Sequence, residues 1–183
     1  MLKKSCAYEP LAVLWRPREE GQSVADDPAS DFVIISEQGV LQYHDGEQSG
    51  VLVHSQKRRI LCAAFVDRST LVTGDDCGDL TFWDWNSTDP LRLKKGAHDI
   101  RIKAVGSIPC DPASPFKCVV SSSSDGFIRL WHVKRSDTCR AMDDEGTDFS
   151  ASGKSSGLAL VLVGEEQTGG RITCLAAGPH CGQ

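Results

Sequence analysis

Three residue types that hydrolases combine occur in the middle of the chain: Ser121, His98 and Asp125. A serine nucleophile, a histidine base and an aspartate that orients the histidine can together perform acyl transfer. That chemistry needs the serine on a sharp exposed turn, commonly within a G-x-S-x-G motif. The sequence has no such motif, and Ser121 lies in the apolar run 118–122, which is predicted to be a β-strand. The sequence therefore favours a structural role for these residues and predicts no catalytic residue.

Motifs that bind phosphate or metal are also missing. The chain contains neither G-x-x-x-x-G-K-[ST] nor G-x-G-x-x-G, the loops that cradle phosphates. Its eight cysteines include no C-x-x-C pair and no accompanying H-x-x-x-H, the spacing used by structural zinc sites. We therefore predict no metal and no cofactor. Cys62, Cys118 and Cys174 lie in apolar runs, where a cysteine is expected to pack as a small buried hydrophobic residue.

Short β-branched and apolar runs, separated by turn residues and without helical periodicity, continue along the chain and predict an all-β protein. The clearest four-stranded unit has its predicted strands at 60–65, 71–73, 80–83 and 91–94. A second unit repeats the order at 102–107, 118–122, 127–131 and 158–163. A weaker unit lies upstream at 11–15, 32–36, 40–43 and 51–54, and a further first strand is predicted at 171–176.

Two glycines share a register with two tryptophans. Gly78 precedes Trp83 by five residues, Gly126 precedes Trp131 by five, and the tryptophans lie 48 residues apart. This period slightly exceeds the ~40–45 residues of a WD blade, and an extra loop at 110–116 accounts for the difference. A WD blade needs a glycine of positive φ in the turn between its second and third strands, and Gly78 and Gly126 occupy that turn. The sequence thus predicts about three WD β-propeller blades plus one extra strand.

The resemblance to WD repeats implies a buried hydrogen-bond relay in the second of the two clear units. Asp125 takes the turn position whose carboxylate accepts from backbone amides and from a histidine in the loop that enters the blade. His98 is that histidine, and the hydroxyl of Ser121 connects it to the indole N–H of Trp131. A fully satisfied chain of this kind fixes a loop to a sheet and rigidifies the core.

The preceding unit matches this relay only in part. Thr73 and Trp83 correspond to the hydroxyl and the indole, but Cys77 stands at the aspartate position and His54 is an uncertain equivalent of the histidine. Two neighbouring carboxylates offer a substitute: Asp75 and Asp76. We expect this blade to be held more by packing than by a polar chain.

Five basic residues lie near predicted turns: Lys57, Arg58, Arg59, Lys94 and Lys95. They could form a basic rim that contacts phosphate, although solvated loop charges are the commoner role of such a group. The whole chain carries 20 basic and 25 acidic residues, a net charge of -5, which gives no general attraction to nucleic acid or anionic lipid. Any contact with RNA would have to be local.

The order of the units resembles a known family. A degenerate blade ending near Tyr43 is followed by RRILCAAFVDRSTLVTGDD, GAHDIRIKAV, SSSSDGFIRLW and GGRITCLA. Over roughly Cys6 to Ala176 this order is similar to the C-terminal half of the PAK-interacting WD-repeat proteins. The resemblance implies a nucleolar scaffold that acts in large ribosomal subunit assembly, and negative regulation of a p21-activated protein kinase. Its expected partners are proteins of pre-ribosomal particles.

The family closes a seven-bladed ring and has a basic tail, whereas about three blades are legible here and Gln183 ends the sequence without such a tail. We expect the chain alone to form an incomplete ring. The predicted units are a degenerate blade at 8–55, blades at 56–97 and 98–170, and the first strand of another blade at 171–183. Polar composition predicts a long loop at 18–31 and a disordered acidic loop at 136–156.

Neither a secretory core nor a run of about 18 apolar residues is present, so no membrane association is predicted. The expected location is the nucleus and nucleolus, with the cytoplasm as the alternative. An alternative function also stays open, a cytosolic WD-repeat adaptor in signalling or cytoskeletal complexes.

Overall fold

The computed structural model describes residues 9–18, 31–44, 47–53, 58–87, 90–110, 114, 116–136 and 157–175. These residues form twelve strands and no helix, so the described part of the chain has no helix that could span a membrane. The predicted all-β fold is confirmed.

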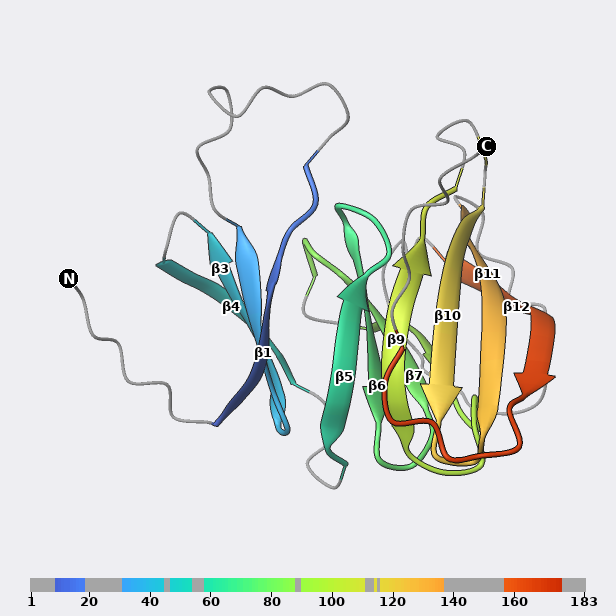
Figure 1. The fold of residues 1–183 in the computed structure, drawn as a ribbon. Coiled ribbons are helices and arrows are strands. Elements are labelled where there is room, and N and C mark those ends of the chain that lie inside the picture. Colours follow the sequence, from blue (N-terminus) through green and yellow to red (C-terminus); the bar gives the residue numbers. More distant parts are fainter. Residues whose placement is uncertain are drawn as a thin grey trace, which may run out of the picture.

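The strands form three antiparallel four-stranded sheets, each in chain order (Figure 1). The first sheet contains β1 (Pro10–Trp15), β2 (Phe32–Ser36), β3 (Gly39–His44) and β4 (Glu47–Val53). The second contains β5 (Ile60–Phe65), β6 (Thr70–Asp75), β7 (Leu80–Asp84) and β8 (Pro90–Lys94). The third contains β9 (Ile102–Ile108), β10 (Lys117–Ser123), β11 (Phe127–Ser136) and β12 (Gly157–Gln167). Each sheet corresponds to one predicted unit.

The end of the described chain differs from the prediction. Residues 171–175 form no strand, because no described strand pairs with them and a β-strand requires a hydrogen-bonded neighbour. Cys174, which was expected to be buried, is consequently exposed. Ser136 is the last residue of β11 and not the start of a loop. The other residues of the predicted loop 136–156, and residues 19–30 of the predicted loop 18–31, lie outside the described residues.

The sheets stand side by side in chain order, with their first strands adjacent (Figure 1). β5 contacts β1 on one side and β9 on the other. This is the arrangement of successive propeller blades, in which the first strand of each blade is innermost. The three sheets form a partial propeller.

Two apolar clusters hold the sheets together face to face. Between the first and second sheets lie the buried residues Val33, Ile35, Val40, Ile60, Phe65, Leu71 and Trp83. Between the second and third lie Val66, Val72, Leu80, Phe82, Ala97, Ile102, Val119, Trp131, Val133 and Leu158. Full burial of one large apolar side chain such as Phe82 contributes about 1.5–3 kcal/mol. Packing therefore fixes the sheets, and the turns at their ends, relative to one another.

Candidate functional site

The four residues of the predicted relay come together at one end of the third sheet. Ser121 lies on β10 opposite Arg129 of the neighbouring strand β11, and Trp131 lies two residues further along β11. Asp125 lies in the turn between these strands, and His98 lies in the loop that leads from β8 to β9. The sheet positions two members, and the loop and the turn bring the other two to it.

The hydrogen bonds of the relay run in one direction. Trp131 Nε1 donates to Ser121 Oγ at 2.9 Å, and Ser121 Oγ lies 2.8 Å from His98 Nε2. His98 Nδ1 lies 3.2 Å from Asp125 Oδ2. Because the serine oxygen accepts from the indole, its proton is free to be donated to Nε2. The histidine then carries its own proton on Nδ1 and donates it to the carboxylate.

Asp125 also closes the turn around it. Its Oδ1 accepts from the amide of Phe127 at 2.9 Å, and its Oδ2 accepts from the amide of Asp99 at 3.3 Å. Burial raises the pKa of this carboxyl, but these amides and His98 outweigh burial and hold the pKa below its ordinary value. Gly126, the next residue, has a φ of 89°, a conformation that glycine adopts without steric cost. One ionised side chain thus joins turn, entering loop and relay.

The serine and the histidine of the relay are closed to solvent. Ser121 is fully buried and His98 is 1% exposed. Burial lowers the pKa of His98, because it penalises the charged imidazolium more than Asp125 favours it. The order serine, histidine, aspartate is that of a hydrolase, yet here the serine oxygen accepts from an indole and no substrate can reach it. The arrangement can orient a loop; it offers no exposed nucleophile.

The second sheet has a shorter polar chain. Trp83 Nε1 donates to Thr73 Oγ1 at 3.0 Å, and that hydroxyl donates to the carbonyl of Thr81 at 3.4 Å. Both of these bonds lie within the second sheet. His54, the uncertain histidine equivalent, lies outside the described residues.

An ion-pair cluster joins loop and turn in this second sheet instead. Arg58, in the loop before β5, pairs with Asp79 and lies 3.4 Å from Asp75 Oδ2. Asp79 Oδ1 also accepts from the amide of Gly96 at 2.8 Å. Both carboxylates are buried. From the sequence alone we expect packing to hold this blade, and Arg58 was not identified as the counterpart of the histidine. The available signal was the position of Arg58 just before a strand and opposite an acidic turn.

The predicted basic rim is not a continuous set of free charges. Arg58 is committed to Asp75 and Asp79, and Arg59 contacts Asp76 at 3.3 Å and Glu37 at 3.7 Å. Lys94 ends the outer strand β8 and Lys95 is exposed beyond it, whereas Arg58 and Arg59 precede the inner strand β5. Lys57 lies outside the described residues. Acidic neighbours thus neutralise the two arginines.

The first sheet uses aromatic stacking where the third uses the relay. Tyr43 takes the tryptophan position and stacks on Phe32 at 4.7 Å between ring centroids, and Phe32 contacts Trp15 edge to face at 5.3 Å. Ile34 is opposite Leu41, and this is the position that Ser121 occupies in the third sheet. Its side chain has no hydroxyl that could take part in a relay. The degenerate blade is held by apolar contacts.

A second polar junction, between the first and second sheets, was also missed. Asp31 Oδ2 lies 2.7 Å from Arg16, and Asp31 Oδ1 lies 2.6 Å from His44 Nδ1. The same arginine donates to the carbonyl of Arg68 at 2.8 Å and stacks over the Trp85 ring at 4.4 Å. These residues lie at or beyond the ends of different strands, and their spacing in the sequence does not indicate that they meet.

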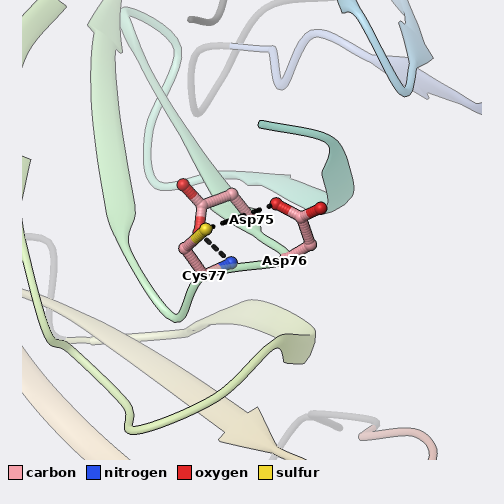
Figure 2. A group of neighbouring side chains, drawn as sticks. All are labelled: Asp75, Asp76 and Cys77. Carbon is pink, nitrogen blue, oxygen red and sulfur yellow. Dashed lines mark hydrogen bonds between the residues drawn. The ribbon is translucent and has the colours of Figure 1, made fainter. Parts of the chain in front are cut away.

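Figure 2 shows the one described group whose side-chain atoms are close enough to share a metal ion: Asp75, Asp76 and Cys77. Asp75 Oδ1 already accepts from the amides of Cys77 and Asp79, each at 2.9 Å. Asp76 accepts from the Arg59 amide at 3.1 Å and side chain at 3.3 Å. Desolvation and the Asp76 carboxylate raise the pKa of the Cys77 thiol, which disfavours the thiolate a metal requires. These contacts describe a hydrogen-bonded turn.

No protein-family model matches the chain. It is 29% identical over 120 residues to human WD repeat-containing protein 55, covering 64% of this chain and 28% of that protein. It is 28% identical over 121 residues to the zebrafish (Danio rerio) p21-activated protein kinase-interacting protein 1-like, covering 66% and 29%. Dynein axonemal assembly factor 10 of Xenopus tropicalis is 30% identical over 110 residues, covering 55% and 30%. The matched region is thus less than a third of each relative.

Among solved structures, a crystal structure of BBS1N in complex with ARL6DN superimposes with a TM-score of 0.64. The match covers 94% of this chain and 45% of that chain at 10% sequence identity, so it concerns the fold alone. The names of these relatives agree with the resemblance of the sequence to the PAK-interacting WD-repeat proteins. The chain is therefore part of a WD-type β-propeller, and its sequence is similar to those of WD repeat-containing protein 55 and the p21-activated protein kinase-interacting proteins.

Proposed function

We propose that the chain is a non-catalytic docking scaffold in the assembly of the large ribosomal subunit, located in the nucleus and nucleolus. The observation that carries the proposal is the ordered match of successive blades to the PAK-interacting WD-repeat family. The geometry supports the non-catalytic part: Ser121 and His98 are buried, and both are bonded within the protein in a chain that ends at Asp125, so the group serves the fold. Its expected partners are proteins of pre-ribosomal particles.

Depletion followed by rescue tests this role. After depletion of the gene product, pulse labelling should show slowed maturation of large-subunit rRNA, and the wild-type protein should co-sediment with pre-large-subunit particles. Rescue with an Asp99→Ala protein serves as the control and should restore maturation as the wild type does, because this exposed side chain lies next to the relay without belonging to it. Normal rRNA processing in depleted cells, together with no co-sedimentation, would contradict the proposal.

A second candidate role follows from the name of the zebrafish relative, which is described as interacting with a p21-activated protein kinase. In this role the propeller surface binds and inhibits such a kinase. Purified protein should then reduce kinase activity towards a peptide substrate in proportion to the amount bound. Binding without inhibition, or no binding, would contradict this role without contradicting the proposed role in ribosome assembly.

An adaptor in cytoskeletal complexes is the remaining alternative, and the similarity to dynein axonemal assembly factor 10 favours it. Affinity capture separates the three roles by what is enriched: large-subunit precursors, a kinase, or dynein components. Enrichment of dynein components without ribosomal precursors would replace the primary proposal.

A further inference from the structure

The outer edge of the third sheet differs from the other two outer edges. β12 is the terminal strand of its sheet, and among the described residues it pairs with β11 alone. The unpaired edge of a sheet is a template for another strand, because its backbone N–H and C=O groups can extend the ladder. Proteins commonly prevent this with short edge strands, proline or lysine.

The outer strands differ in where such protection lies, and β12 has it only in its last part. β8 has five residues, begins with Pro90 and ends with Lys94. β4 has seven residues and begins with Glu47. β12 has eleven residues, and its first seven, GLALVLV at 157–163, include no charged residue and no proline. The edge is therefore apolar from 157 to 163, and its bulge and its charged residues, Glu165 and Glu166, come only at or after the end of that run.

The side chains along this edge are also open to water. Val161 is 55%, Leu162 45% and Val163 43% exposed, whereas Leu158 and Leu160 pack into the core between the second and third sheets. Single exposed apolar residues are ordinary on a protein surface, but three in succession on a free edge form a surface suited to association.

We propose that β12 pairs with β12 of a second copy of this chain, antiparallel and centred on Leu160. In that register each small residue lies opposite a larger one or a leucine opposite a leucine: Gly157 and Val163, Leu158 and Leu162, Ala159 and Val161. Antiparallel residues directly opposite one another lie about 4.5–5.5 Å apart between Cα atoms, close enough for these pairs to pack.

The ends of the strand fit the same register. Trp131 is in register with Leu162 and Leu130 with Gly164, so Val163 is the extra residue of a β-bulge. A bulge bends the strand, and it ends the regular edge where the proposed pairing ends. Glu165 and Glu166 follow the bulge, and the antiparallel arrangement places these carboxylates of the two copies at opposite ends of the pair. A charged peptide would find no opposite charge within 157–163.

The charge of the chain predicts how this pairing depends on salt. Each copy has a net charge of -5, so two copies repel each other at long range. Salt screens that repulsion while leaving the backbone ladder intact. The dimer should therefore become tighter as ionic strength rises, whereas an association based on opposite charges would weaken.

Sedimentation of the full-length chain over a range of concentrations tests the pairing. A monomer–dimer equilibrium is expected, and Val161→Lys should weaken it at least about tenfold, since lysine is a common means of blocking a free edge. Val13→Lys is the matched control, because Val13 is 51% exposed but lies on β1. A monomer at all concentrations, or loss of the dimer in Val13→Lys with retention in Val161→Lys, would overturn the proposal.

Cross-linking tests the register independently. When Ala159→Cys and Val161→Cys proteins are mixed and oxidised with glutathione disulfide, two thiols lose their protons and electrons to form the link, and two glutathione molecules are released. Peptide mass spectrometry should find a link between positions 159 and 161 in the mixture only. In either variant alone the new cysteines lie about 7–8 Å apart on the diagonal, too far for a disulfide. Links of equal yield in the separate variants would overturn this register. The inference is independent of the proposed function.

Discussion

The carbonyl oxygen of His98 lies directly against Gly78, at the place where a side chain on that glycine would begin. The amide of His98 donates to the carbonyl of Gly78 at 2.9 Å, and the φ of Gly78 is 91°. The turn of the second sheet and the loop entering the third sheet therefore touch through their backbones. A glycine is required at this position for two reasons, its conformation and the space it leaves.

Gly78→Ala should lower the free energy of unfolding by on the order of 3 kcal/mol, because it adds backbone strain and displaces the loop. Gly96→Ala is the control, since Gly96 has a φ of 60° but nothing within 4 Å of an added Cβ. It should cost about 1 kcal/mol, from backbone strain alone. Equal losses in the two variants, measured by chemical denaturation, would show that the contact with His98 has no effect.

Asp125→Ala should destabilise the protein by about 1–3 kcal/mol, the usual cost of leaving buried polar groups without a partner. The variant removes the acceptor of His98 Nδ1 and of the Phe127 and Asp99 amides. Asp99→Ala, at an exposed neighbouring position, should change stability by less than about 0.5 kcal/mol. Denaturation curves of both variants measure the difference, and an unchanged Asp125→Ala protein would mean that the relay contributes nothing.

Stability should fall as the pH drops below the ordinary His98 pKa of 6.5. The folded protein holds this pKa below 6.5, so the unfolded chain binds a proton first and is favoured as acid is added. Above that value the contribution is fully present. Asp125, whose pKa is also lowered, adds a second loss only below its ordinary value of 3.8.

The pH effect is isolated by comparing the wild type with His98→Gln, because this substitution removes the His98 imidazole and leaves every other titratable group in place. The difference in unfolding free energy between the two proteins should decrease from pH 7.5 to pH 5.5. A constant difference over this range would show that His98 is not held neutral by the fold.

Arg58→Ala and Arg59→Ala should differ although the residues are adjacent. Removal of Arg58 takes away a cation that pairs with the buried Asp79 and Asp75 and should cost on the order of 1–3 kcal/mol. Arg59 is 60% exposed, and its removal should cost no more than about 1 kcal/mol. Thermal unfolding of the two variants provides the measurement, and a larger loss from Arg59→Ala would contradict the assigned contacts.

Thiol labelling should separate the cysteines by their environments. Burial raises the pKa of Cys62 to about 12, so iodoacetamide should modify it only after unfolding. Cys77 and Cys174 are exposed and should be modified in the native protein. Peptide mass spectrometry reports each site. Rapid native labelling of Cys62 would mean that the junction between the second and third sheets opens readily.

The fold could be predicted because its information is local. Short β-branched and apolar runs between turn residues mark the strands, and the five-residue spacing from Gly78 to Trp83 and from Gly126 to Trp131 marks the repeat. The polar junctions could not be predicted so well, because each is a meeting of loops far apart in sequence. The sequence alone leaves Arg58 as either a phosphate-contacting or a solvated charge, because nothing local pairs it with the buried Asp79. In the same way, nothing local connects Arg16 to the Arg68 carbonyl.

The prediction of a strand at 171–176 was wrong for a related reason. Its apolar composition is that of a first strand, but a strand exists only with a hydrogen-bonded neighbour, and no described residue supplies one to 171–175. Composition reports what a segment can form, while pairing decides what it does form. The same distinction separates Cys62, which packs against the core, from the exposed Cys174.

The double engagement of His98 affects how the chain matures during synthesis. Its backbone completes the turn of the second sheet, while its side chain reaches residues of the third sheet that are translated later. The strands of the second sheet can pair once residue 94 has left the ribosome, but the carbonyl of Gly78 gains its bond from the His98 amide only when residue 98 follows. The imidazole must then wait until Ser121 and Asp125 emerge before it gains its partners. A pause or truncation between these points would present a nascent chain with an ordered sheet and an unanchored loop, a substrate for chaperones.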